Sequence, residues 1–468
     1  MARAMGRTAD VMEAIRGRIA SRALTRGDRL PSIRSLAATL AVSPSTVVEA
    51  YDRLVAEGAV LSRPGSGFYV SAGAVTPAVN ALPVRADRAV DPLWVSRQSL
   101  DAEPATLKPG CGWLPADWMP NTILRRSIRK LARGEDGLLA DYGNARGSLP
   151  MRQLIARRGA ADGLAIDPEQ ILLTPSGSQA IDLVCRFLLK PGDTVLVDDP
   201  CYFNFQALLQ AHRVRIVGVP YTPTGPDPVR FADVLATERP RLYITNAAIH
   251  NPTGATLGAQ TAHRLLTAAS ARGLIIVEDE IFSEFEPEPS PRLAALDGLV
   301  NVIRIGSFSK TLSASVRCGY VAARPDWIEA MVDLQVATNF GGASPVAVRL
   351  IHDSLMDSAY RRHMEALRRR LSVARREAAT RLAGLGIEVF VAPRGGFYLW
   401  GRLPDGADAS AIAREGLRED VILAPGNVFS AGESVRDFMR FNVAQMLDGR
   451  VYDVLRRALA RTPAARHR

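Results

Sequence analysis

Apolar and polar positions along the first part of the chain change from a helical to a strand spacing. Between Thr8 and about Ala23, apolar residues recur every three to four positions, as on one face of a helix. Ser32 and Ser43-Pro44 favour helix starts, and Gly58 suits a left-handed helix end. The pattern therefore predicts helices at about 8–23, 33–40 and 44–57, followed by a hairpin with strands at 60–63 and 68–70.

Residues 71–106 are rich in Ala, Pro and Val, a composition that indicates a partly stiffened linker. From Leu107 onward, short apolar runs alternate with longer helical segments, which is typical of an α/β domain. Strands are expected at 171–174, 274–280, 319–322, 386–391, 395–400, 421–423 and 437–442. The chain is predicted to be multidomain, with domains at 1–72 and 107–468, a linker at 73–106, a large lobe at about 107–330 and a small lobe at about 380–455.

Composition narrows the function classes. The net charge of +10 is compatible with nucleic acid, but the basic excess is spread along the chain. Four cysteines and six histidines show no ligand spacing, so no metal site is expected. The N-terminus lacks an apolar signal core, and no apolar run is long enough to span a bilayer, so we expect a cytoplasmic protein without a membrane partner.

The N-terminal order of three helices and a hairpin resembles the winged helix-turn-helix domain of the GntR family. The matching stretches are 30–37, 43–47, 51–54 and 65–70. The resemblance implies that the third helix enters the major groove of double-stranded DNA. Arg53 either contacts DNA or pairs with Glu49, and the two glycines of the hairpin turn are needed by the turn itself. The candidate DNA-binding residues are Arg34, Ser43, Ser45, Thr46, Arg53, Arg63, Gly65 and Gly67.

Lys310 is the chemically conspicuous residue of the second domain. It is one of only four lysines among 58 basic residues, and it follows Ser307-Phe308-Ser309 after an apolar run. A lysine that forms an imine needs a partly buried site, where desolvation keeps its amine neutral. Ser307, Ser309 and Arg317 could together hold a phosphate. The segment resembles the pyridoxal-phosphate lysine segment of fold-type I aminotransferases, so Lys310 is the candidate Schiff-base lysine.

A second anion-binding element is predicted where the strand at 171–174 turns into a helix. Backbone amides at the helix start, around Ser176, Gly177 and Ser178, can bind a phosphate dianion.

The aminotransferase resemblance assigns roles to five further residues. Tyr202 would stack on the pyridine ring, Asn251 would donate to its O3′ oxygen, and Asp279 would pair with the protonated ring nitrogen, improving the ring as an electron sink. Tyr142 would reach the cofactor phosphate of a neighbouring subunit. Arg440 would bind the α-carboxylate of an effector; a structural ion pair is the alternative.

One residue departs from the family pattern. Many relatives place a tyrosine that contacts O3′ shortly after the aspartate, where this chain has Phe282. The missing hydroxyl favours sensing over turnover, unless another tyrosine fills the space.

The combined resemblances identify the chain as a member of the MocR subgroup of GntR-type regulators. They imply a homodimer that binds pyridoxal 5′-phosphate through Lys310 and reports an amine, an amino acid or the cofactor itself to the DNA-binding domain. The alternative is an active aminotransferase that carries a DNA-binding module. A third interpretation, an architectural DNA-binding protein without cofactor, conflicts with the intact set of Asn251, Asp279, Lys310 and Arg317.

Overall fold

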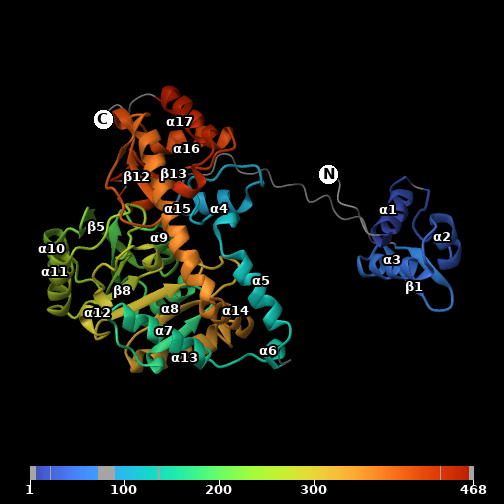
Figure 1. Cartoon of the computed structure of the whole chain (residues 1–468), viewed down its shortest axis with the longest axis horizontal. Helices are drawn as coiled ribbons and strands as arrows, with labels where there is room; N and C mark the ends of the chain where they lie inside the picture. Colours follow the sequence, from blue (N-terminus) through green and yellow to red (C-terminus); the bar gives the residue numbers. More distant parts are fainter. Residues whose placement is uncertain (1–6, 22, 72–89, 135–136, 433, 463–468) are drawn as a thin grey trace. The chain divides into compact units, whose positions relative to one another are not determined.

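The computed structural model describes residues 7–21, 23–71, 90–134, 137–432 and 434–462. These residues form two compact units, one ending at Ser71 and one beginning at Val90 (Figure 1). Within the described ranges, no helix has both the length and the apolar character that crossing a membrane requires.

The N-terminal unit contains the three predicted helices and the predicted hairpin. The elements are α1 (Arg7–Ala20), α2 (Ile33–Leu40), α3 (Pro44–Ala56), β1 (Val60–Arg63) and β2 (Gly67–Val70). Both predicted caps form, because the hydroxyls of Ser32 and Ser43 each accept a backbone N–H three residues later, at 3.2 Å. Val47, Tyr51 and Leu54 project from α3 into a closed core. Packing of the buried face of α3 in this core therefore fixes the position of its exposed face.

The C-terminal unit is built on an eight-stranded sheet with the order β3-β10-β9-β8-β7-β4-β5-β6. Its central strands run parallel, while β10 and β6 are antiparallel to their neighbours. The strands are β3 (Ile171–Thr174), β4 (Thr194–Asp199), β5 (Arg215–Thr222), β6 (Gly225–Pro226), β7 (Leu242–Thr245), β8 (Ile275–Asp279), β9 (Val302–Ser307) and β10 (Gly319–Ala322). The carboxyl ends of parallel strands meet at one edge, which is where such sheets bind ligands.

Helices cover both faces of this sheet. Successive strand residues belong to different core clusters, as Leu172 and Leu173 do on β3. Because both faces of the sheet are buried, successive residues of its strands are apolar, which explains the continuous apolar runs in the sequence. The helices of this part are α5 (Asn121–Leu131), α6 (Gly137–Ala140), α7 (Leu149–Ala161), α8 (Gly177–Leu188), α9 (Phe203–Ala211), α10 (Pro228–Glu238), α11 (Ala259–Ser270), α12 (Leu293–Asp297), α13 (Pro325–Asn339) and α14 (Pro345–Met356).

A second, antiparallel sheet comes after the long helix α15 (Ser358–Ala383) in the chain. Helix α15 runs from the larger sheet to this smaller one (Figure 1). Its order is β11-β12-β14-β13. The remaining elements are β11 (Glu388–Val389), β12 (Tyr398–Arg402), α16 (Ala409–Arg418), β13 (Ala424–Pro425), β14 (Phe438–Asn442) and α17 (Gly449–Arg461).

The structure differs from the predicted linker and lobe boundaries in three places. Residues 94–101 of the predicted linker form helix α4 (Trp94–Asp101), whose Trp94 and Val95 are buried. Leu107 and Gly110, expected in the large lobe, hydrogen-bond to residues 420 and 422 beside the smaller sheet. The strand expected at 421–423 makes only an isolated bridge to Leu107. In each case, contacts distant in sequence outweighed the local composition.

We predict that Leu54→Ala destabilises the N-terminal unit by about 2–5 kcal/mol, because it opens a cavity in a closed core. Val48→Ala, at an exposed position of the same helix, is the control and should change the free energy of unfolding by less than about 0.5 kcal/mol. Urea denaturation of the full chain, followed by circular dichroism, measures both. Equal effects of the two substitutions would contradict the packing of α3.

Candidate functional site

A cavity of about 140 Å³ lies where the carboxyl ends of β7, β8 and β9 meet the start of α8. Its wall contains ten of the eleven residues predicted to bind the cofactor: Ser176, Gly177, Ser178, Tyr202, Asn251, Asp279, Ser307, Ser309, Lys310 and Arg317. These residues are separated by up to 141 positions in sequence, and the sheet brings them together.

Lys310 follows β9 and is half-buried in this cavity. Its Nζ donates a hydrogen bond to the carbonyl oxygen of Gly112 at 2.6 Å. Burial lowers the pKa of Lys310 to about 8, with the nearby positive charge of Arg440 acting in the same direction. A much larger share of the amine is therefore neutral near neutral pH than in a lysine exposed to water, and the neutral form is the one that attacks a carbonyl.

Asp279 ends β8 in the same wall, and burial raises the pKa of its carboxyl group to about 7. Its Oδ1 accepts the backbone N–H of Ile281 at 3.1 Å, and no described cationic side chain lies within ion-pair distance. A buried carboxylate in this state favours a positively charged partner. The protonated nitrogen of a pyridine ring fits that requirement.

Asn251 is oriented by two neighbours. Its backbone N–H donates to the side-chain oxygen of Asn246, whose Nδ2 donates to the backbone oxygen of Asp279 at 2.7 Å. The Nη1 of Arg440 donates to the side-chain oxygen of Asn251 at 2.8 Å. Because a guanidinium can only donate, the Nδ2 group of Asn251 is left to donate to an oxygen such as O3′.

The phosphate end of the cavity is the start of α8. Ser176 is the N-cap, and its hydroxyl accepts the backbone N–H of Gln179 at 3.1 Å, which leaves the hydroxyl hydrogen free to donate. A Cβ on Gly177 would lie 3.3 Å from the Cβ of Ser307, so only glycine fits without displacing this neighbour. The exposed Arg317 and the helix dipole add positive charge, and together these groups suit a dianion. The residues present thus fit pyridoxal 5′-phosphate.

Arg440 lies behind this wall rather than in it. The residue is fully buried, its Nη2 donates to the carbonyl oxygen of Gly110 at 2.7 Å, and its guanidinium carbon lies 4.3 Å from the ring centroid of Tyr398. No described carboxylate pairs with it, so the alternative of a structural ion pair has no support among the described residues. Its Nε has no hydrogen-bond partner among the described residues. The predicted carboxylate contact requires Arg440 to exchange its present acceptors.

Phe282 lines the cavity, and so does the neighbouring Ile281, so this segment supplies no hydroxyl. Tyr398 lies next to Phe282, with ring centroids 5.5 Å apart, and reaches the cavity from β12. Sequence reasoning placed a strand at this position but did not assign Tyr398 to the site. Only the approach of the smaller sheet brings it there.

Helix α4 is the second element that sequence reasoning missed. Val95, Ser96 and Ser99 line the cavity, and the buried hydroxyl of Ser99 has no hydrogen-bond partner within the described ranges. Surrounding prolines concealed this helix of eight residues. A helix within the segment predicted as a linker therefore forms part of the cavity wall.

Tyr142 lies outside the cavity of its own chain. It is 70% exposed and contacts the 65% exposed Phe340 edge-on, with ring centroids 4.9 Å apart. The contact of Tyr142 with the cofactor phosphate of a neighbouring subunit stays a prediction.

The DNA-binding candidates lie on the surface of the N-terminal unit. Arg34 on α2 is exposed without an ion pair among the described residues, whereas Arg53 pairs with Glu49 at 2.5 Å. Arg63 lies over the ring of Tyr69, 4.5 Å from its centroid. Ser43 caps α3 and hydrogen-bonds to the hydroxyls of Ser45 and Thr46. Gly65 and Gly67 have φ values of 72° and 107°, which the turn requires.

Among the described residues, no group of His, Cys, Asp or Glu side chains is arranged to hold a metal ion.

Two protein families match the chain. Residues 116–457 match the family described as Aminotransferase class I and II, and residues 7–70 match the family described as Bacterial regulatory proteins, gntR family. The predicted fold class, a winged helix-turn-helix domain joined to a fold-type I aminotransferase domain, is confirmed.

Two HTH-type transcriptional regulators and one transaminase are similar to the chain over most of their own length. The uncharacterised HTH-type transcriptional regulator YdcR of Escherichia coli is 30% identical, over 92% of this chain and 94% of its own length. The HTH-type transcriptional regulator NorG of Staphylococcus aureus is 24% identical, over 91% and 98%. The 2-aminoadipate transaminase of Thermus thermophilus is 29% identical, over 73% of this chain and 87% of its own.

Solved aminotransferase structures share the fold of the C-terminal unit. The α-aminoadipate aminotransferase LysN from Thermus thermophilus, complexed with N-(5′-phosphopyridoxyl)-L-leucine, has a TM-score of 0.71 at 26% identity, covering 78% of this chain and 94% of that one. The kynurenine aminotransferase of Pyrococcus horikoshii has a TM-score of 0.72 at 22% identity, covering 80% and 95%.

We predict that Asp279→Asn stabilises the cofactor-free chain at alkaline pH. The raised pKa means that the folded chain keeps a proton which the unfolded chain releases, so stability falls as pH rises from about 4 to about 7, and the whole penalty is present above that. The gain relative to wild type should be larger at about pH 8 than at about pH 5 by a few kcal/mol, at about 1.4 kcal/mol per pKa unit. Urea denaturation at both pH values measures it. The exposed Asp333→Asn is the control, and a gain of equal size at the two pH values would contradict the assignment.

Proposed function

The chain belongs to the aminotransferase class I and II family and carries the DNA-binding domain of gntR-family bacterial regulators, and we propose that it is a MocR-type transcriptional regulator that senses an amine, an amino acid or pyridoxal 5′-phosphate itself. The predicted cofactor is supported by the family match and by the phosphopyridoxyl complex of LysN. One observation carries the sensing proposal: the cavity of Lys310 is partly walled by α4, the first described helix after the DNA-binding unit.

Different residues of the cavity wall would hold different parts of the cofactor. The start of α8, with Ser307, Ser309 and Arg317, would bind the phosphate, and Asp279 would hold a proton on the ring nitrogen. Lys310 would supply a partly neutral amine to anchor the cofactor, and an effector amine would compete with it for that position. When bound, the cofactor supplies a carbonyl carbon that condenses with amines.

An effector carboxylate would compete for Arg440. The guanidinium is now held by an amide oxygen and a carbonyl oxygen, both neutral, and a carboxylate makes stronger, charge-assisted hydrogen bonds. If Arg440 exchanged these two acceptors for a carboxylate, the segments around Asn251 and Gly110 would lose their hydrogen bonds to β14. Effector binding would thus alter the packing between the smaller sheet and the cofactor cavity.

Helix α4 would carry this change toward the DNA-binding unit. Its Ser96 and Ser99 lie in the cavity wall, so an occupant contacts them directly. An effector acts only by the difference in its affinity for two states of the protein. We propose that these states differ in the position of α4, and therefore in where the chain leaves the C-terminal unit.

A homodimer acting on operator DNA in the cytoplasm completes the proposal. Exposed apolar side chains occur on neighbouring elements of the C-terminal unit: Ile128, Leu139, Tyr142, Leu149 and Phe340. Their exposure is consistent with an interface between two copies, at which Tyr142 would reach the partner's cofactor.

The second candidate function is an active aminotransferase. The 29% identity to a 2-aminoadipate transaminase and the presence of both Lys310 and Asp279 in the cavity favour it. Ile281 and Phe282 count against it, because neither provides a hydroxyl near O3′, but Tyr398 brings the hydroxyl of another tyrosine into the same cavity. Amino transfer to 2-oxoglutarate at ordinary enzymatic rates would decide for the enzyme.

We predict that Lys310→Ala abolishes the visible absorbance of the bound cofactor and the response of operator binding to amines, because no other described lysine lies in the cavity. Lys190→Ala, at an exposed position, should leave both unchanged. Absorbance spectroscopy and a promoter-binding assay with candidate amines measure the two effects. A visible band that persists in Lys310→Ala would refute the role of this lysine.

We predict that Arg34→Ala weakens operator binding and reduces the slope of log K against log salt by about 1, the amount expected for one phosphate contact. Arg16, whose guanidinium is held by Glu57 at 2.7 Å, is the control position, and Arg16→Ala should leave the salt slope unchanged. Fluorescence anisotropy over a salt series tests this. An unaltered slope in Arg34→Ala would remove Arg34 from the interface.

A further inference from the structure

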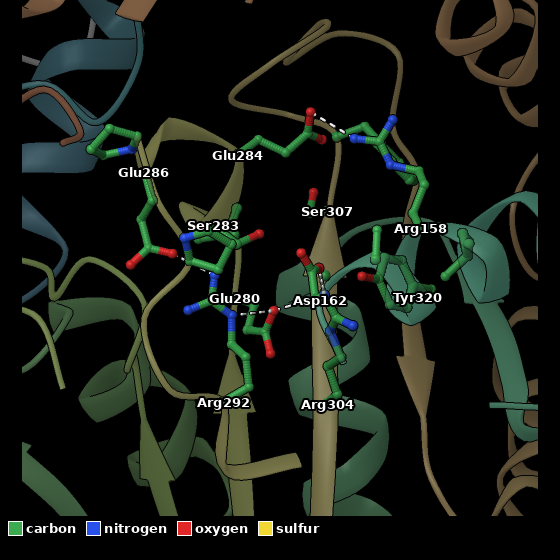
Figure 2. Close-up of a pocket in the computed structure, with 18 of the residues that line it drawn as sticks. Arg158, Asp162, Glu280, Ser283, Glu284, Glu286, Arg292, Arg304, Ser307 and Tyr320 are labelled. Carbon is green, nitrogen blue, oxygen red and sulfur yellow. Dashed lines mark hydrogen bonds and ion pairs between the residues drawn. The ribbon is translucent and has the colours of Figure 1, made fainter. Parts of the chain in front are cut away.

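A second cavity, of about 320 Å³, lies on the other side of the segments that carry Ile281 and Ser307, which line both cavities. Figure 2 shows charged side chains entering it from β9, from the end of α7 and from the segment after β8. Its volume is at the lower end of the range of about 300–1,000 Å³ typical of small-molecule sites. None of the cofactor roles above uses its charged residues.

One end of the cavity is an ion cluster with unmet hydrogen-bonding capacity. Glu280 lies 2.7 Å from the Nη2 of Arg304 and 3.3 Å from the Nε of Arg292, and all three side chains are at least 95% buried. Arg292 also pairs with Glu286. Even so, both oxygens of Glu280 and one oxygen of Glu286 accept no well-aligned hydrogen bond from the described residues. Buried acceptors in this state favour a ligand that brings N–H donors.

The opposite end presents guanidinium groups. Arg158 pairs with Glu284 at 2.8 Å, and the Nε of Arg368 donates to the backbone oxygen of Glu284 at 2.9 Å. Figure 2 shows the Arg158–Glu284 pair apart from the Glu280 cluster, with Ser307 between them. The remaining N–H groups of Arg368 make no hydrogen bond to a described residue, so this end can donate to an anion.

The total charge of the lining indicates which ligands fit. Four arginines and four acidic residues face the cavity: Arg158, Arg292, Arg304, Arg368, Asp162, Glu280, Glu284 and Glu286. A ligand with net charge would leave one charge uncompensated in a partly buried site. A ligand that carries an ammonium group at one end and a carboxylate at the other would not.

We propose that this second cavity binds a small zwitterion of the α-amino acid class, with its ammonium group against Glu280 and Glu286 and its carboxylate toward Arg158 and Arg368. The site is separate from the cofactor cavity, so its ligand needs no reaction with Lys310. Because Ile281 and Ser307 belong to both walls, occupancy of one cavity changes ligand affinity in the other, and the coupling is reciprocal.

The test uses the full-length protein with its cofactor fixed to Lys310 by borohydride reduction, which prevents exchange with amines. Isothermal titration with the twenty L-amino acids should find at least one that binds saturably, at one site per chain. For that ligand, the analogues lacking the amino group or the carboxylate should bind about tenfold more weakly or worse, since each leaves a buried charge unpaired.

A matched pair of variants locates the site. Ser283 lines the cavity without a side-chain hydrogen bond to a described residue, so Ser283→Phe should fill the cavity and abolish binding, while Ser283→Ala should retain it. Glu280→Gln should also weaken binding. Thermal unfolding and the retained cofactor absorbance check that each variant is folded. Absence of binding by all twenty amino acids, or unchanged affinity in folded Ser283→Phe, would overturn the proposal.

Discussion

The guanidinium of Arg440 is the group on which the arrangement of the C-terminal unit most depends. It is fully buried without a carboxylate partner among the described residues, so its charge is balanced by amide and carbonyl oxygens and by three aromatic rings. Its two acceptors lie in segments distant from β14 in sequence, those of Asn251 and Gly110. One cation therefore joins β14 of the smaller sheet to the segments around Asn251 and Gly110. Because its partners are neutral, this bond is also the one that a carboxylate can replace.

Buried charge organises the rest of the site in a similar way. Burial raises the pKa of Asp279 and lowers that of Lys310, which favours the neutral form of each. A charged partner for Asp279, or a reactive one for Lys310, would offset the cost of this burial. On the other side of the same segments, Glu280, Arg292 and Arg304 balance one another, but with imperfect hydrogen-bond geometry. Asp279 and Glu280 are adjacent on one strand end and face different cavities. Alternation along an extended chain thus places two distinct polar sites on either side of a single segment.

The position of α4 explains how a site of this kind can serve regulation. In an enzyme, the cavity wall has to close around a substrate. Here part of that wall is α4, the first described helix after the DNA-binding unit, so an occupant of the cavity would contact this helix directly. No relay through the eight-stranded sheet is needed.

Local patterns in the sequence determined the three helices and the hairpin of the N-terminal unit, because caps, spacing and turn residues there act over a few positions. They also determined three of the eight strands of the larger sheet, β3, β8 and β10, and, through family resemblance, the ten residues that line the cofactor cavity. The sequence also contains an arginine within the apolar run of β9, Arg304, which indicates a buried charge just as Arg440 does within β14. This residue was not among the predicted site residues. What only the tertiary structure decided is which side chains distant in sequence meet: Tyr398 with Phe282, Arg440 with Asn251, Ser99 with the cofactor cavity, and Glu280 with Arg304. Those contacts arise from packing two sheets and a connecting helix around buried charge, and no local periodicity encodes them.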